Sequence, residues 1–144
     1  MLQFNHVSMR YPNGFDALKN VSFSLAAGEM AFLTGHSGAG KTTLLKLILL
    51  IERATRGTLL VNNQNVSRLP RRRVPQLRRT VGVVFQDYKL LYDRSVFDNV
   101  ALPLIVSGVA HRDVGRRVRA ALDKVGLLGK EMLSPITLSG GEQQ

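Results

Sequence analysis

The segment GHSGAGKT, Gly35 to Thr42, constrains the fold more than any other part of this sequence. It matches the pattern G-x-x-x-x-G-K-[S/T] of a phosphate-binding loop. An apolar run without alternation, residues 30–34, precedes it, and a leucine-rich segment without glycine or proline, residues 41–51, follows it. The sequence therefore predicts a strand buried on both faces, then a tight loop, then a buried helix, which together form one unit of an α/β fold.

The chemistry of this loop suits a bound chain of phosphates. Glycines allow tight turns in which successive N–H groups point at one anion, and the following helix adds the positive end of its dipole. We expect Lys41 to contact the β- and γ-phosphates and the Thr42 hydroxyl to ligate Mg²⁺. Thr43 borders the same site, but its spacing excludes it as the metal ligand. The remaining loop residues expected to bind nucleotide are Gly35, His36, Ser37, Gly38, Ala39 and Gly40.

Periodicity predicts the other elements. Alternating apolar residues indicate strands, and apolar residues at helical spacing indicate helices. The expected strands cover 2–8, 21–25, 59–61 and a second buried run at 81–85. The expected helices cover part of 70–79, then 95–102, closed by Pro103, and 112–125, closed by Gly126. The order predicts an α/β core with a small antiparallel β element beside it.

Composition limits the classes of protein to consider. The chain has a net charge of +10 and no cysteine, which excludes disulfides and thiolate metal sites. No apolar run approaches the roughly 18 residues of a membrane span, and no secretory signal is expected. The basic balance suits an anionic partner. Two arginine groups, at 68–79 and 112–119, contain no interleaved aromatic residues, so nucleic acid beyond the nucleotide is not expected as a partner, while a membrane-adjacent surface stays open.

A phosphate-loop NTPase also needs a polar residue at the end of a second buried strand to act on Mg²⁺ and water. The segment VGVVFQD offers two candidates, Gln86 and Asp87. If Asp87 were the metal ligand, a small phosphate-loop kinase would be possible, but that alternative leaves the C-terminal segment LSGGEQQ unexplained.

The phosphate loop, FQD and LSGGEQQ together resemble the nucleotide-binding domain of ABC transporters. The resemblance implies a phosphate-loop NTPase core with an antiparallel β subdomain and part of a helical subdomain, and it implies ATP and Mg²⁺ as cofactors. It implies that Tyr11 stacks on adenine and that Gln86, in the Q-loop, senses Mg²⁺ and the attacking water. Asp87 is then a neighbour of the Q-loop rather than the metal ligand.

The resemblance also gives LSGGEQQ a role. Ser139, Gly140 and Gly141 match the family's signature motif, which contacts the γ-phosphate of ATP held by the other subunit of a head-to-tail homodimer. Within the family, a groove for a coupling helix of the membrane partner would be formed in part by Tyr88, Leu90, Leu91 and Tyr92. Local core packing is a close alternative for these side chains.

Longer segments, including FQDYKLLYDRSVFDNVALPL, resemble the family's cell-division members. This implies an ATPase on the cytoplasmic face of the bacterial inner membrane, peripheral to an integral-membrane partner resembling FtsX. Close alternatives are the ATPases of lipoprotein-release and macrolide- or peptide-export transporters. A non-catalytic ATP-binding module is a third.

The sequence departs from the family pattern after the signature. The family continues into a strand ending in a metal-linked aspartate, a general-base glutamate and a switch histidine, and only Gln143 and Gln144 follow Glu142 here. We therefore expect residues 1–144 to be a C-terminally truncated ATP-binding domain, inactive by itself although the intact protein hydrolyses ATP.

Overall fold

The computed structural model describes residues 1–144, which divide into two compact units, Met1–Val81 and Gly82–Gln144. Each unit is described by itself. None of the helices combines the length and the apolar character that crossing a membrane requires.

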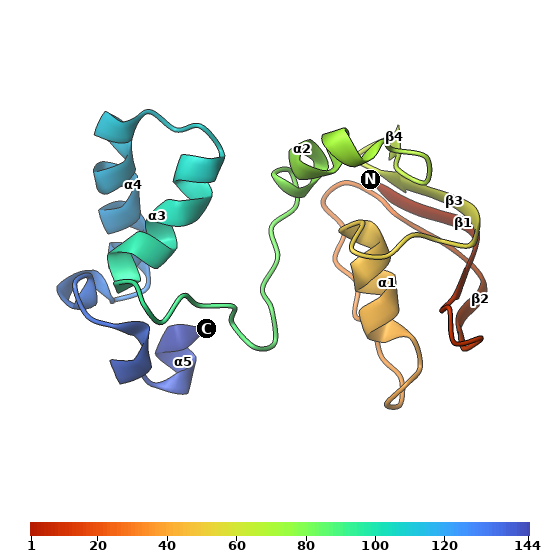
Figure 1. Ribbon diagram of the computed structural model, residues 1–144, viewed down its shortest axis with the longest axis horizontal. Helices are drawn as coiled ribbons and strands as arrows, with labels where there is room; N and C mark the ends of the chain where they lie inside the picture. The colour runs from red at the N-terminus through yellow and green to blue at the C-terminus, as the bar shows by residue number, and fades with distance from the viewer. The chain divides into compact units, whose positions relative to one another are not determined.

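The first unit contains an antiparallel sheet (Figure 1). Its spatial order is β2-β1-β3-β4, so the first strand lies between the second and the third. The strands are β1 Leu2–Arg10, β2 Asp16–Leu25, β3 Arg56–Val61 and β4 Gln64–Asn65. The strands expected near 2–8, 21–25 and 59–61 are therefore confirmed, each with longer bounds.

One face of β1 carries the core of this unit. Phe4 and Val7 are completely buried, although a spacing of three would place them on opposite faces of a regular strand. An irregularity in the pairing with β2 lies between these two residues, and His6 within it has a φ of 50°. This β-bulge adds one residue to β1, so the side chain of Val7 points to the same buried face as that of Phe4.

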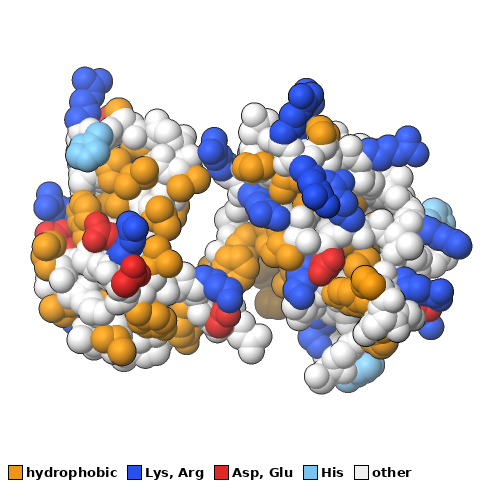
Figure 2. All heavy atoms as spheres, viewed as in Figure 1, with side chains coloured by type: hydrophobic (Ala, Val, Ile, Leu, Met, Phe, Trp, Pro, Cys, Tyr) orange, Lys and Arg blue, Asp and Glu red, His pale blue; other side chains and the backbone are white.

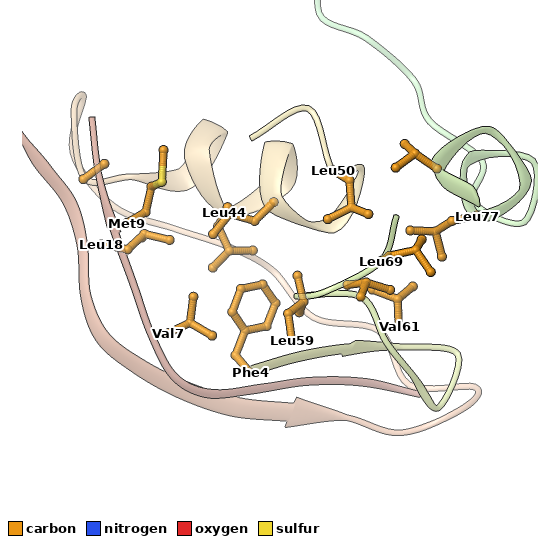
Figure 3. Packing of buried hydrophobic residues seen from close by; sticks show 14 residues of the cluster. Phe4, Val7, Met9, Leu18, Leu44, Leu50, Leu59, Val61, Leu69 and Leu77 are labelled. Carbon is orange, nitrogen blue, oxygen red and sulfur yellow. The ribbon is translucent and has the colours of Figure 1, made fainter. Parts of the chain in front are cut away.

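Helix α1, Lys41–Ile48, packs on this face of the sheet (Figure 3). Thr43, Leu44 and Leu47 are buried at the spacing of one helical stripe. The helix is shorter than the expected 41–51, and Leu45 is half exposed, so the expectation of a fully buried helix was wrong. Only the stripe that faces the sheet is covered.

A short helical segment closes the same core. It consists of the 3₁₀ turn η1, Arg71–Arg73, and helix α2, Val74–Arg78, which confirms partial helix over 70–79. Val74 and Leu77 of α2 reach the buried cluster formed by the sheet and α1.

The second unit is helical. It contains α3 Val96–Val106, α4 His111–Lys124, the 3₁₀ turns η2 Leu128–Lys130 and η3 Pro135–Thr137, and α5 Gly140–Gln143. Val114, Val118 and Leu122 of α4 are buried at the expected helical spacing. Helix α3 runs through Pro103 instead of ending before it. Pro103 has no N–H to donate to the carbonyl oxygen of Asn99, four residues earlier in the helix. Pro103 itself is exposed.

The two expected buried strands, 30–34 and 81–85, are not formed. Neither segment has strand structure, and Met30, Phe32 and Val84 are 81%, 84% and 75% exposed. A strand exists only when a neighbour completes its hydrogen-bond ladder, and the sheet here contains four other segments. Both segments therefore have the composition of a buried strand, but neither has a neighbouring strand to pair with in this structure.

Phe4 and Phe23 give a test of this core. Their rings stack with centroids 4.7 Å apart, but Phe4 is completely buried and Phe23 is 38% exposed. We expect Phe4→Ala to lower the free energy of unfolding by about 3–5 kcal/mol. Phe23→Ala is the matched control, because it removes the same stacked pair with less burial and should cost clearly less. Urea denaturation followed by circular dichroism measures both, and equal losses would contradict this account of the core.

Candidate functional site

The phosphate loop is anchored at its last residue. Gly40 has a φ of 89°, and its carbonyl oxygen accepts the first helical hydrogen bond of α1, from Leu44 N, at 2.9 Å. A Cβ atom on Gly40 would lie 2.5 Å from the carbonyl oxygen of Ala17. Only glycine fits this conformation and this close approach to β2, so the sheet fixes the point at which the loop becomes a helix.

The side chain of Lys41 closes the loop on itself. Its Nζ donates to the carbonyl oxygens of Gly35 and His36, at 2.6 and 2.7 Å. The ammonium group is thus held over the loop by the loop's own backbone. A phosphate chain entering there would meet a cation already in place, with no rearrangement of the helix.

A hollow of about 450 Å³ opens beside this loop, and no acidic side chain lines it. The combination of loop N–H groups, a helix N-terminus and one lysine fits an anion. The lining residues are Phe15, Ala17, Ser37, Gly38, Ala39, Gly40, Lys41, Thr42 and Thr43.

The two threonines after Lys41 differ in their surroundings. Thr42 is exposed and lines the hollow, and its role as a metal ligand stays a prediction. Thr43 is 7% exposed, and its hydroxyl lies 3.1 Å from the hydroxyl of Tyr11. Thr43 therefore borders the hollow and ties Tyr11 to α1.

The structure places two aromatic residues of the first unit near the loop, and sequence reasoning identified only one. Tyr11 is half-buried and packs against the core, while Phe15 is 55% exposed and lines the hollow itself. The turn between β1 and β2 joins them, because Tyr11 N donates to the carbonyl oxygen of Phe15 at 2.9 Å. The position of Phe15 just before a strand that contacts the loop is the signal that could have found it.

Gln86 and Asp87 belong to the second unit. Both are exposed in a turn, and Asp87 forms an ion pair with Lys89 at 2.5 Å. The hydrogen bond from Lys89 holds the pKa of the Asp87 carboxyl below its usual value. Asp87 thus has a lysine partner. The chain contains no group of three or more acidic, histidine or cysteine side chains placed to hold a metal ion.

The signature residues begin helix α5 with a complete capping box. The Ser139 hydroxyl accepts from the Glu142 backbone N–H, and the Glu142 carboxylate accepts from Ser139 N at 2.9 Å and from its hydroxyl at 3.1 Å. The N–H groups of Gly140 and Gly141, in the first turn, have no helical carbonyl partner. Both residues are exposed, and a Cβ atom on Gly141 would meet nothing within 4 Å.

A lysine from another element supports this cap. Lys130 Nζ, at the end of η2, donates to Glu142 at 2.6 Å. This bond, together with those from Ser139, lowers the pKa of Glu142 from 4.5 to about 2. The sequence did not reveal this pair, because a lysine twelve residues before a glutamate carries no signal of contact.

The aromatic segment after Gln86 contacts helix α5. The Tyr92 hydroxyl contacts Gln143 Oε1 at 3.5 Å, and Leu90 lines an apolar hollow of about 480 Å³ that Leu138 and Gly141 also border. These residues therefore take part in packing within the second unit. Their use as a groove for a membrane partner stays a prediction.

Comparison with known proteins gives concordant matches. Residues 18–144 match the protein family described as ABC transporter. The chain is 58% identical over 144 residues to the cell division ATP-binding protein FtsE of Escherichia coli (strain K12), and 42% identical to FtsE of Bacillus subtilis (strain 168). Both alignments cover all of this chain, and it spans 65% and 63% of the length of these two relatives.

Two solved structures share the fold. The dimeric, post-hydrolysis structure of the ATP-binding cassette MJ0796, bound to ADP and Pi, is similar with a TM-score of 0.89 and 30% identity, over 99% of this chain and 65% of that one. CbiO1 from Clostridium perfringens, part of the ABC transporter complex CbiONQ, is similar with a TM-score of 0.85 and 26% identity. The match covers 99% of this chain and 57% of that one. These likenesses confirm the fold class expected from the sequence.

The Lys130–Glu142 pair predicts a pH dependence at the signature. Because the folded state holds the Glu142 pKa at about 2, below its ordinary 4.5, this contact stabilises the fold above about pH 4.5, and its contribution is lost as the pH falls through about 2. Lys130→Met should raise the Glu142 pKa toward 4.5, whereas Lys124→Met, which removes the same charge from the end of α4, should not. Carboxyl ¹³C shifts measured by NMR report this value, and an unshifted Glu142 in the unaltered protein would refute the pairing.

Proposed function

The chain belongs to the ABC transporter family, and on that premise we propose that the intact protein is an ATPase subunit that couples ATP binding and hydrolysis to a membrane partner in bacterial cell division. The phosphate loop carries this proposal. Its lysine is held over the loop by two backbone carbonyl groups, beside a hollow without acidic residues. That arrangement suits the phosphate groups of a nucleotide.

The residues of the first unit would hold ATP as follows. Loop N–H groups and Lys41 would contact the β- and γ-phosphates, and the exposed Thr42 hydroxyl would ligate Mg²⁺. When bound, Mg²⁺ offsets the charge that develops on the transferring phosphoryl group. Tyr11 stacks on adenine and is kept in place by its hydroxyl contact with Thr43 at 3.1 Å. By the resemblance to the family, Gln86 would sense the metal ion and the attacking water.

The signature residues would act on a second copy of the chain. Ser139, Gly140 and Gly141 offer a hydroxyl and two N–H groups at the start of a capped helix, which suits the γ-phosphate of ATP bound to the partner subunit. Two ATP molecules then join two subunits head to tail, and hydrolysis removes the joining contacts. The dimeric MJ0796 cassette supports this assembly by its similarity.

The cell-division role has its support in the relatives. The chain is 58% and 42% identical to two proteins named as cell division ATP-binding proteins, across its whole length. We therefore place the protein at the cytoplasmic face of the inner membrane, peripheral to an integral-membrane partner resembling FtsX. We propose that ATP hydrolysis is an activity of the intact subunit.

Loss of the Lys41 ammonium should weaken nucleotide binding. Lys41→Ala removes a charged donor to two phosphate groups, so the Kd for ATP should rise at least about tenfold and hydrolysis by the intact protein should fall to background. Lys46→Ala, at the other end of the same helix, is the matched control and should bind ATP normally. Isothermal titration calorimetry measures both variants. Unchanged affinity in Lys41→Ala would remove the basis of the proposal.

The base contact can be separated from the phosphate contact. Tyr11→Ala should raise the Kd for ATP about 5- to 150-fold, the range expected for loss of one base–aromatic stack, and should leave inorganic triphosphate binding unchanged. Tyr11→Phe should retain most of the ATP affinity, because only the contact with Thr43 is lost. A larger effect in Phe15→Ala than in Tyr11→Ala would reassign the base to Phe15.

The membrane partner separates division from export. We expect the intact protein, purified from membranes after mild solubilisation, to retain an integral-membrane protein resembling FtsX, identified by mass spectrometry. Recovery of a permease for lipoprotein release or for macrolide or peptide export in its place would contradict the division role while leaving the ATPase assignment intact.

A further inference from the structure

The segment from Arg53 to Gln86 is strongly and uniformly basic. It contains no aspartate or glutamate and no lysine, so nothing within it offsets its guanidinium groups. Its eight arginines are Arg53, Arg56, Arg68, Arg71, Arg72, Arg73, Arg78 and Arg79. Such a segment keeps its full positive charge at any physiological pH, because arginine does not lose its proton in proteins.

Two of these arginines have structural partners. Arg53 donates to the carbonyl oxygen of Leu69 at 2.6 Å and so fixes the chain just before η1. Arg78 donates to the carbonyl oxygens of Leu49 and Leu50, at 2.9 and 3.1 Å, and so ties α2 to the end of α1. These three hydrogen bonds hold the basic segment against the rest of the first unit.

The other arginines of η1, α2 and the residues beside them form what we call the arginine ridge: Arg68, Arg71, Arg72, Arg73 and Arg79. All five are exposed, and none takes part in an ion pair. Figure 2 shows Lys and Arg side chains gathered over the part of this unit where Figure 1 draws α2. Val74 and Leu77 anchor the ridge from beneath in the buried core.

We propose that the arginine ridge binds the anionic headgroups of a phospholipid membrane surface. Guanidinium groups pair with phosphate oxygens through two parallel hydrogen bonds, and several of them on one rigid segment can contact several headgroups together. The ridge thus attaches the subunit directly to the membrane, independently of any integral-membrane partner. The proposal goes beyond the ATPase function and does not rest on it.

The composition of the segment favours lipid over nucleic acid. Single-stranded nucleic acid is held by basic side chains combined with aromatic rings on which bases stack. No aromatic residue occurs between Phe32 and Phe85, so the ridge has charge without any stacking surface. A membrane surface needs only the charge, because its phosphates form a continuous anionic layer.

The expected binding is electrostatic and therefore dependent on salt. Each arginine near an anionic surface strengthens association about fivefold, so removing three should weaken it roughly 100-fold. The effect falls off within a Debye length, about 10 Å at 0.1 M salt, so binding should weaken steeply as the salt concentration rises.

Vesicle binding by the intact protein tests the proposal. The probe is phosphatidylcholine vesicles containing about one third phosphatidylglycerol, with pure phosphatidylcholine as the neutral reference. We expect sedimentation with the anionic vesicles only, and a loss of roughly 100-fold in the triple variant Arg71→Gln, Arg72→Gln, Arg73→Gln. The corresponding triple lysine variant keeps the charge and should bind anionic vesicles far more tightly than the glutamine variant, although it loses the paired hydrogen bonds of arginine. These side chains are exposed, and circular dichroism verifies that each variant is folded.

The matched control removes the same charge elsewhere. The triple variant Arg112→Gln, Arg116→Gln, Arg117→Gln loses three exposed arginines of α4 and should bind anionic vesicles as the unaltered protein does. Equal loss in both triple variants would show that net charge, and not the ridge, attracts the membrane. Equal binding to neutral vesicles would also overturn the proposal. So would binding to a single-stranded RNA oligonucleotide that depends on Arg71–Arg73, together with no binding to anionic vesicles.

Discussion

The hydrogen bonds from Lys41 Nζ to the carbonyl oxygens of Gly35 and His36 are the contacts on which the proposed nucleotide site depends. They place a cation over a loop whose end is set by the sheet. Gly40 fixes the end, because its close approach to Ala17 leaves no space for a side chain. The sheet, the core beneath it and α1 therefore act together to hold one ammonium group where a phosphate chain can meet it.

In the second unit, the exposed start of helix α5 has backbone N–H groups that could bind an anion. Ser139 and Glu142 cap α5 reciprocally, and Lys130 from η2 holds the Glu142 carboxylate at 2.6 Å. This leaves the N–H groups of Gly140 and Gly141 available at an exposed helix start. We propose that the loop of one copy and the signature of another together form a site for a triphosphate.

Much of this could be predicted from the sequence, and the failures share a cause. The phosphate loop has a local pattern, and the strands and helices with one buried face follow from periodicity, as Val114, Val118 and Leu122 illustrate. The runs at 30–34 and 81–85 failed because burial of a strand depends on partners elsewhere in space. The links from Tyr11 to Thr43 and from Lys130 to Glu142 were invisible for the same reason, since they join residues distant in the chain.

We infer that a complete nucleotide site needs the loop of one copy and the signature of the other. Sedimentation of the intact protein with a non-hydrolysable ATP analogue, using Lys41→Ala and Ser139→Glu variants, tests it most directly. We expect neither variant to dimerise alone but an equal mixture to do so, because the mixed dimer contains one site in which both parts are unaltered. If the unaltered protein dimerises and the mixture does not, or if Ser139→Glu dimerises alone, the claim is contradicted.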